Sequence, residues 1–112
     1  MFLIEKSDAP RQPEITEVKK DSISLKWLAP EKDGGSPIFN YVIESKPPRS
    51  PKWVPVTDNI QVPDCSFTVK DLTEGFEYEF RVLAENKAGL SKPSSSTGPI
   101  ITKEPIGKSF WY

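Results

Sequence analysis

The stretch Glu77–Glu85, with the sequence EYEFRVLAE, decides the fold class of this chain of 112 residues. Apolar side chains occupy every second position, namely Tyr78, Phe80, Val82 and Ala84. The positions between them are Glu77, Glu79, Arg81, Leu83 and Glu85. A period of two is typical of a strand, and only the apolar face can be buried without leaving ions unpaired. The stretch therefore predicts a β-strand with one buried face and one exposed, mostly charged face.

Other parts of the chain show the same alternation. The inward positions are Ile23, Leu25 and Trp27 in Ser22–Trp27, and Tyr41 and Ile43 in Phe39–Lys46. Shorter strand candidates are Glu14–Val18, Lys52–Thr57, Ser66–Val69 and Pro99–Thr102. No window keeps apolar residues at helical spacing for three turns, so the sequence favours strands throughout.

Twelve prolines and six glycines separate these stretches. Ala29–Pro37 (APEKDGGSP) combines two prolines with a Gly-Gly pair, which is typical of a loop. The prolines of Lys46–Pro51 (KPPRSP), and Pro55 after them, fit an edge strand, because proline cannot donate a hydrogen bond to a neighbouring strand. Seven short strands separated by such turns predict an all-β fold: a seven-stranded antiparallel Greek-key β-sandwich of the immunoglobulin-like kind.

The composition excludes several classes of function. Fifteen Lys and Arg residues against sixteen Asp and Glu residues give a net charge of −1, which argues against a nucleic-acid or membrane-lipid surface. The absence of histidine removes His-dependent nucleophilic catalysis and His-ligated zinc. The single cysteine, Cys65, cannot form an internal disulfide, and no stretch is long and apolar enough to span a membrane. We therefore expect one domain with no catalytic residues, no cofactor and no metal.

Several motifs together resemble the fibronectin type III domain. They are Leu25-Lys26-Trp27 followed by Pro30, Ile38-x-x-Tyr41-x-Ile43, Leu72-x-x-Gly75-x-x-Tyr78, and Asn86-x-x-Gly89 followed by Ser91 and Pro93. The resemblance covers residues 9–102. Residues 1–8 are then expected to be an N-terminal linker, and residues 103–112 a C-terminal linker or the start of a next segment. The aromatic tail Ser109–Tyr112 either packs on the sandwich or belongs to that segment.

The loop sequences narrow the resemblance. Asp33–Ile38 (DGGSPI), Trp53 and Tyr78–Gly89 are similar to the modules of giant muscle proteins such as titin, twitchin, projectin and the myosin-binding proteins. This implies a non-catalytic spacer and docking module of a large multidomain scaffold, cytoplasmic and located in the A-band of the sarcomere. The implied partners are myosin or other thick-filament proteins and neighbouring Ig or fibronectin type III modules. The isolated domain is expected to be a monomer, and the parent chain could carry a kinase domain elsewhere.

The alternative is an extracellular adhesion or receptor module of the same fold. The single cysteine argues against it, since extracellular domains are often rich in disulfides. The absence of any Asn-x-Ser/Thr acceptor for glycosylation argues in the same direction.

The expected structural core follows from the inward positions and the motifs. It comprises Ile23, Leu25, Trp27, Tyr41, Ile43, Leu72, Tyr78, Phe80 and Val82. Trp27 is expected to be the largest buried group. Tyr78 matches the tyrosine corner, in which the phenol hydroxyl bonds an upstream backbone group. Gly75, three residues before it, is expected to have a positive φ.

The candidate protein-docking face consists of outward residues on two strands that are expected to pair: Glu44, Lys46, Glu79, Arg81 and Glu85. Cross-strand ion pairs of modest stability are the alternative interpretation. The loops Glu31–Ser36 and Lys87–Lys92 are a second candidate surface. We interpret Cys65 as an inert buried thiol, because no basic residue adjoins it in the sequence.

Overall fold

The computed structural model describes residues 3–57 and 59–104, and its regular elements are strands. They are β1 (Arg11–Val18), β2 (Ile23–Leu28), β3 (Asn40–Lys46), β4 (Val54–Pro55), β5 (Ser66–Val69), β6 (Glu77–Asn86), β7 (Gly89–Leu90) and β8 (Ile100–Ile101). The described residues contain no helix that is long and apolar enough to cross a membrane. The predicted tail Ser109–Tyr112 lies outside the described residues.

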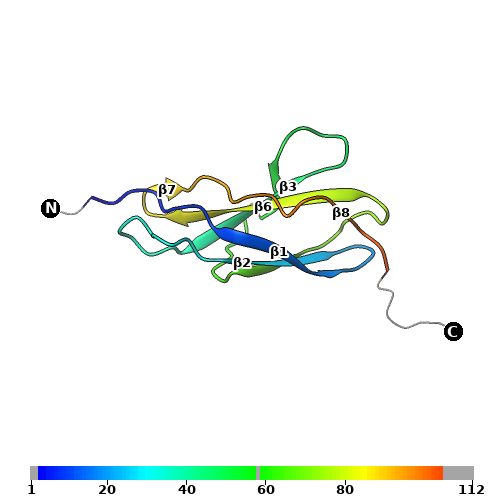
Figure 1. Ribbon diagram of the computed structural model, residues 1–112, viewed down its shortest axis with the longest axis horizontal. Coiled ribbons are helices and arrows are strands. Elements are labelled where there is room, and N and C mark those ends of the chain that lie inside the picture. The colour runs from blue at the N-terminus through cyan, green and yellow to red at the C-terminus, as the bar shows by residue number, and fades with distance from the viewer. Residues whose placement is uncertain (1–2, 58, 105–112) are drawn as a thin grey trace.

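The strands form two antiparallel sheets that pack face to face (Figure 1). One sheet has the order β1-β2-β5, and the other has the order β4-β3-β6-β7, with β8 also paired to β6. The chain crosses between the sheets at β2–β3, β4–β5 and β5–β6, so strands distant in sequence become neighbours. The prediction of an all-β antiparallel sandwich is confirmed. The described chain enters at one end of the long axis and leaves at the other (Figure 1).

The last strand differs from the prediction, because residues 89–101 follow β6 as two short strands joined by an irregular stretch. This stretch is held against β6 by every third residue, namely Ser91, Ser94 and Thr97. Their backbone N–H groups donate to the carbonyls of Ala84, Val82 and Phe80 at 2.8–2.9 Å. Their hydroxyls accept hydrogen bonds from the N–H groups of the same three β6 residues at 2.9–3.2 Å. Side-chain oxygens thus replace backbone carbonyls in the ladder. The first paired part of this strand is β7, which lies within the predicted loop Lys87–Lys92.

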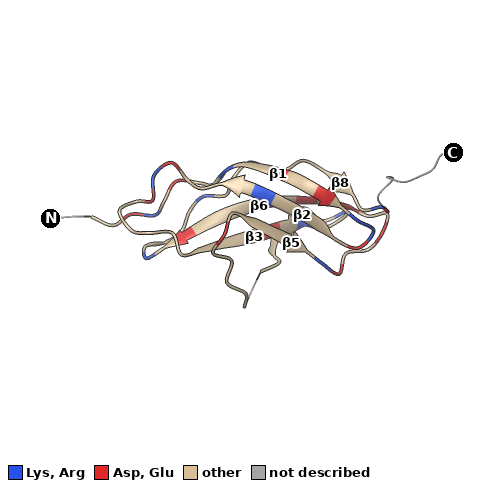
Figure 2. Cartoon of the chain, turned by 90° about the horizontal axis from the view of Figure 1, so that it is seen from below, with Lys and Arg blue, Asp and Glu red and all other residues tan. Residues whose placement is uncertain are grey.

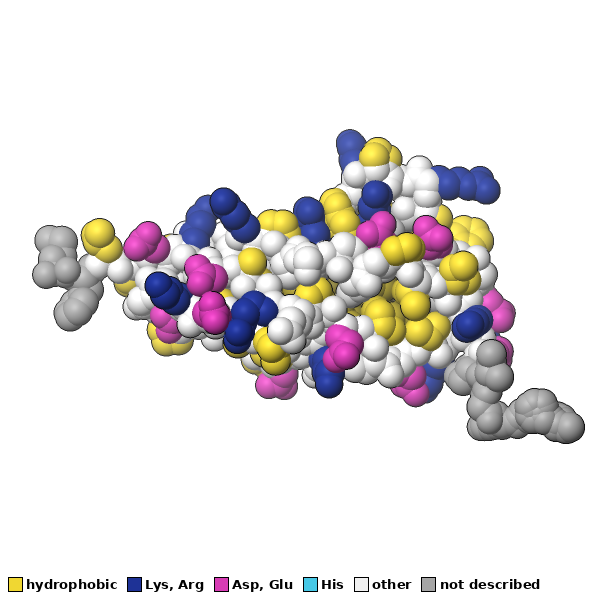
Figure 3. Space-filling model, viewed as in Figure 1, with side chains coloured by type: hydrophobic (Ala, Val, Ile, Leu, Met, Phe, Trp, Pro, Cys, Tyr) yellow, Lys and Arg dark blue, Asp and Glu magenta, His cyan; other side chains and the backbone are white. Residues whose placement is uncertain are grey.

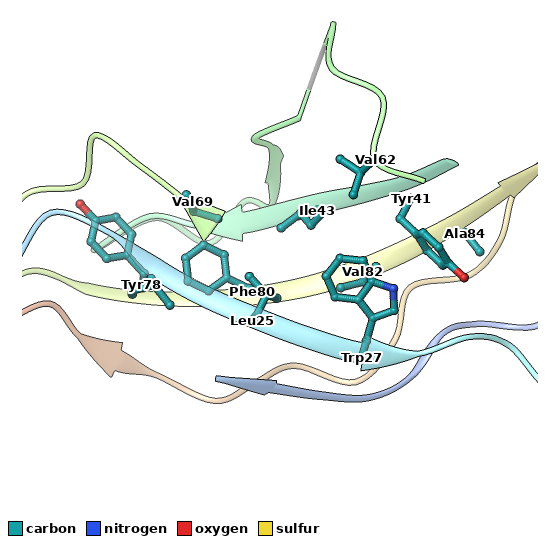
Figure 4. Close-up of a cluster of buried hydrophobic side chains, with 11 residues drawn as sticks. Leu25, Trp27, Tyr41, Ile43, Val62, Val69, Tyr78, Phe80, Val82 and Ala84 are labelled. Carbon is teal, nitrogen blue, oxygen red and sulfur yellow. The ribbon is translucent and has the colours of Figure 1, made fainter. Parts of the chain in front are cut away.

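The core lies between the sheets (Figure 4). Trp27 is 3% exposed and meets the ring of Tyr41 edge to face, with 5.4 Å between ring centroids. Tyr78 stacks on Phe80 at 6.4 Å. Among the expected core residues Leu72 is partly buried at the edge of the cluster, and the structure buries the others. Val62 and Val69 also belong to the core.

Leu83 is buried, although the alternation of β6 places it on the outward face. The register sets it opposite Val42 on β3. Two apolar side chains that face each other across a strand pair cover one another, which reduces the exposure of both. The outer surface of this sheet is therefore apolar at Leu83 and charged further along the strands.

Tyr78 forms the tyrosine corner, because its hydroxyl accepts a hydrogen bond from the N–H of Thr73 at 3.0 Å. We expect Tyr78→Phe to lower the free energy of unfolding by about 0.5–1.5 kcal/mol, since the ring stays packed and one hydrogen bond is lost. Tyr41→Phe is the matched control, because the weak thiol of Cys65, at 3.5 Å, is the one hydrogen-bond partner of the Tyr41 hydroxyl within residues 3–57 and 59–104. Urea unfolding measures both, and an equal loss in the two variants contradicts the assignment.

Candidate protein-docking face

The predicted docking face lies on the outer surface of β3 and β6 and comprises Glu44, Lys46, Glu79, Arg81 and Glu85. The register places Glu44 opposite Arg81 and Lys46 opposite Glu79. The residues between them on each strand are buried, so these charged side chains point away from the core. The structure therefore brings the five residues together on one surface.

Arg81 makes the shortest ion pair on this face. Its Nε lies 2.7 Å from Oε1 of Glu44, and the two side chains are 27% and 18% exposed. Its guanidinium also lies 4.5 Å from the centre of the Trp53 ring. A guanidinium that is paired with a carboxylate and stacked on an indole has little freedom to move. Glu44, Arg81 and Trp53 thus form a preorganised cluster.

The other charges of the face are paired more loosely. Lys46 Nζ lies 4.0 Å from Oε1 of Glu79, whose Oε2 accepts a hydrogen bond from the hydroxyl of Ser96 at 2.7 Å. Glu85 accepts a hydrogen bond from Nδ2 of Asn40 at 2.9 Å. Each predicted docking residue therefore already has a partner within the domain. The cross-strand ion pairs of the alternative interpretation are present. The docking role of these residues remains a prediction, because ion pairing within the sheet does not prevent docking.

Charges of both signs are spread over the whole molecule rather than gathered on one side. Red and blue segments alternate around the chain in Figure 2, and basic and acidic side chains are mixed on the face seen in Figure 3. The loop between β3 and β4 projects from the body and carries basic side chains (Figures 1 and 3). A surface of this kind offers local contacts to a protein partner and no extended positive field.

The second candidate surface, formed by loops Glu31–Ser36 and Lys87–Lys92, is organised by Asn86. This side chain is 1% exposed, and its Nδ2 donates to the carbonyl of Asp33 at 2.7 Å and to the carbonyl of Glu5, also at 2.7 Å. Its Oδ1 accepts a hydrogen bond from the N–H of Ala88 at 2.8 Å. One buried amide therefore joins two loops and the N-terminal segment at one end of the sandwich.

The family model named "Fibronectin type III domain" matches residues 8–99 of the sequence. The chain belongs to the fibronectin type III family. A fibronectin type III domain is a non-catalytic module, and its expected extent, residues 9–102, remains a prediction.

This fibronectin type III domain is similar to modules of muscle proteins. It is 36% identical over 105 residues to human cardiac-type myosin-binding protein C, a match that covers 94% of this chain and 8% of that protein. It is 42% identical to a solved structure of domains A168–A170 from titin, with a TM-score of 0.82, over 88% of this chain and 33% of that one. The chain is 34% identical to a solved structure of the twitchin kinase region from C. elegans, with a TM-score of 0.83. That match covers 93% of this chain and 18% of the twitchin chain. The predicted resemblance to titin, twitchin and the myosin-binding proteins is confirmed, and this chain spans a small part of each relative.

Three residues of the docking face were missing from the prediction, namely Asn40, Trp53 and Ser96. Asn40 lies at the start of β3, in the same outward phase as Glu44 and Lys46, so its place on the face follows from the alternation. Trp53 lies just before β4, and its stacking on Arg81 depends on how the projecting loop folds back. Ser96 belongs to the irregular stretch before β8, which no strand pattern reveals.

Cys65, which we predicted to be a buried inert thiol, is half-buried and packs against the core of this fibronectin type III domain. Its thiol lies 3.5 Å from the hydroxyl of Tyr41. Burial, with a smaller contribution from Cys65, raises the pKa of the Tyr41 hydroxyl above its ordinary value. Among the described residues, no group of three His, Cys, Asp or Glu side chains is placed to hold a metal ion.

The two ion pairs of the face are expected to differ in strength. A double-mutant cycle on Glu44 and Arg81, each replaced by glutamine and then together, should give a coupling energy of about 0.5–1.5 kcal/mol, because the contact is short and half-buried. The same cycle on Lys46 and Glu79 should give less than about 0.5 kcal/mol, because that contact is longer and more exposed. Urea unfolding at low and high salt measures both. Equal coupling energies contradict the assignment of Arg81 as the fixed charge.

Proposed function

We propose that this fibronectin type III domain is a non-catalytic spacer and protein-docking module of a large intracellular muscle scaffold, placed along the thick filament in the sarcomeric A-band. The observation that carries the proposal is the Glu44–Arg81–Trp53 cluster on a domain similar to modules of myosin-binding protein C and titin. The proposed partners are myosin or other thick-filament proteins and neighbouring Ig or fibronectin type III modules.

The shape of the domain suits serial linkage. The described chain enters at one end of the long axis and leaves at the other, so modules of this kind can follow each other along a filament (Figure 1). Each docking contact can be weak, because many modules in one chain bind with a high effective concentration. A small, partly charged face is therefore sufficient for this role.

The Glu44–Arg81–Trp53 cluster has the features of a binding hot spot. Arginine and tryptophan are enriched among the residues that dominate binding energies, and both are already held in place here. A partner carboxylate can approach the guanidinium of Arg81 from the solvent side, with Trp53 as an apolar neighbour. Little conformational entropy is lost on binding, since the cluster is ordered beforehand.

The test is co-sedimentation of the purified chain with purified thick filaments. The charge swap Glu44→Arg with Arg81→Glu keeps an ion pair on the fold and reverses its polarity, so the domain should remain folded and lose binding by about tenfold or more. The swap Glu14→Lys with Lys26→Glu is the matched control, because these two residues form an exposed ion pair at 3.5 Å on the outer face of the other sheet. Unchanged binding of the swapped variant would show that this face is not the docking site.

The proposed location has its own test. A fluorescently labelled chain added to permeabilised muscle fibres should decorate the A-band, and the swapped variant should decorate it weakly. Staining of the cell surface in place of the A-band would favour the alternative of an extracellular adhesion module.

A further inference from the structure

The segment Leu3–Asp8 is held against one end of the sandwich. The N–H of Glu5 donates to the carbonyl of Gly34 at 2.9 Å, and the N–H of Asp8 donates to the carbonyl of Lys32 at 3.0 Å. The segment and the loop run in opposite directions, as adjacent antiparallel strands do. Residues expected to form a linker are therefore joined to the domain by two backbone hydrogen bonds.

Gly34 and Asn86 show that the fit of this segment is specific. A Cβ atom on Gly34 would overlap the carbonyl oxygen of Glu5, and φ of Gly34 is +77°, so glycine alone permits this approach. Asn86 supplies the hydrogen bond to the same carbonyl of Glu5. Since Asn86 is buried, both of its amide hydrogens are satisfied only when the segment is in place. Gly34 and Asn86, at this end of the domain, are therefore residues whose local structure depends on residues 3–8.

Beyond these contacts the segment presents apolar groups to solvent. Leu3 is 75% exposed and Ile4 is 48% exposed. Figure 3 shows one hydrophobic group standing clear of the body at this end. Beside Leu3 lies an open hollow of about 650 Å³ against the loop before β3. The charged residues that line it are Glu5, Glu31, Lys32 and Asp33. Glu31 is also paired with Arg11 at 3.7 Å, so the hollow is weakly acidic.

We propose that residues 3–8 form a docking site for the folded module that precedes this one in the same polypeptide. Leu3 and Ile4 contact apolar side chains of that module, and a Lys or Arg of the module enters the acidic hollow beside them. Because the segment is fixed to the sandwich, the preceding module keeps one orientation and the joint is stiff. The inference rests on the proposed function of a serial module, and it adds that the spacing between two modules is fixed by contacts rather than by a flexible tether.

The first test measures whether the segment is rigid in this chain. The backbone amide of Glu5 should have an NMR order parameter of about 0.85, as in a rigid sheet. In Gly34→Ala it should fall below about 0.6, because the new methyl group displaces the carbonyl of Glu5. Gly75→Ala is the matched control: φ of Gly75 is +84°, and a Cβ there meets nothing within 4 Å, so it shares the backbone strain and leaves the segment in place.

A second variant keeps this test decisive if Gly34→Ala fails to fold. Glu5→Pro removes the N–H that donates to Gly34, at an exposed position. Since proline has no amide hydrogen, the readout in this variant is the amide of Lys6, whose order parameter should fall below about 0.6. An order parameter below about 0.6 at Glu5 in the unaltered chain overturns the proposal.

The second test uses the chain extended to include its preceding module. The two modules should tumble with one rotational correlation time, and the double variant Leu3→Ser with Ile4→Ser should separate their correlation times. Ile60→Ser is the control, because Ile60 is 53% exposed and lies away from this end. Independent tumbling of the unaltered modules, or a parent chain without a folded module directly before Leu3, overturns the proposal.

Both measurements are made on purified protein without thick filaments. A failure of the Glu44–Arg81 face to bind filaments leaves the order parameters and correlation times unchanged. A mobile N-terminal segment likewise leaves filament binding through that face unchanged, so the two proposals fail separately.

Discussion

Replacing Trp27 with alanine is expected to remove a large part of the stability of the domain. The indole is 3% exposed and packs against Tyr41 between the two sheets (Figure 4). Truncation of a buried aromatic residue to alanine costs about 3–5 kcal/mol, because apolar contacts are lost and a cavity remains. A domain of this size has a total stability of about 5–15 kcal/mol, so the loss takes a large part of it. Urea unfolding followed by circular dichroism measures the change.

Two further variants separate packing from polarity at this site. Within the described residues, Nε1 of Trp27 is buried without a hydrogen-bond partner, so its N–H contributes no favourable contact. Trp27→Phe should therefore cost clearly less than Trp27→Ala, since it removes the unpaired N–H and keeps an aromatic ring. Leu28→Ala, at the exposed neighbouring position, should change the stability by less than about 0.5 kcal/mol. An alanine variant at position 27 as stable as Leu28→Ala would refute the assignment of Trp27 to the centre of the core.

The parts of the fold that the sequence predicts are those with a regular period. β2, β3 and β6 alternate apolar and polar residues, and their inward residues, such as Trp27 and Phe80, meet between the sheets. The last strand lacks this period, because Ser91, Ser94 and Thr97 repeat every third residue and bond to β6 through hydroxyls as well as through the backbone. A search for period two cannot detect such a strand.

The candidate site shows the same limit. Glu44 and Arg81 can be placed on one surface from the alternation of two strands, because pairing of β3 with β6 follows from the fold. The identity of each ion pair depends on the register, which is fixed by packing of both faces and not by either strand alone. The stacking of Trp53 on Arg81 depends on the course of a proline-rich loop. Contacts made by irregular segments therefore need the structure.

Asn86→Ala is expected to lower the free energy of unfolding by about 2–4 kcal/mol, because three hydrogen bonds are lost at a buried position. The amide joins the carbonyls of Glu5 and Asp33 and the N–H of Ala88, so the N-terminal segment and two loops lose their common anchor. Urea unfolding gives the magnitude. Hydrogen exchange of the Glu5 amide should accelerate more than exchange in β6, since the local anchor is removed and the core remains.

Two comparisons make this expectation specific to the geometry of Asn86. Asn86→Asp keeps the size of the side chain and its acceptor for Ala88, yet it sets a carboxylate oxygen against two carbonyl oxygens in place of the amide donor. It should therefore cost at least as much as Asn86→Ala, although it is the more conservative change. Asn40→Ala should cost less than half as much, because Asn40 also makes two side-chain hydrogen bonds but is half-buried, so water can replace them. If Asn86→Asp were as stable as the unaltered chain, the amide could not be donating to the two carbonyls. Residues 3–8 would then lack the side-chain anchor that Asn86 provides.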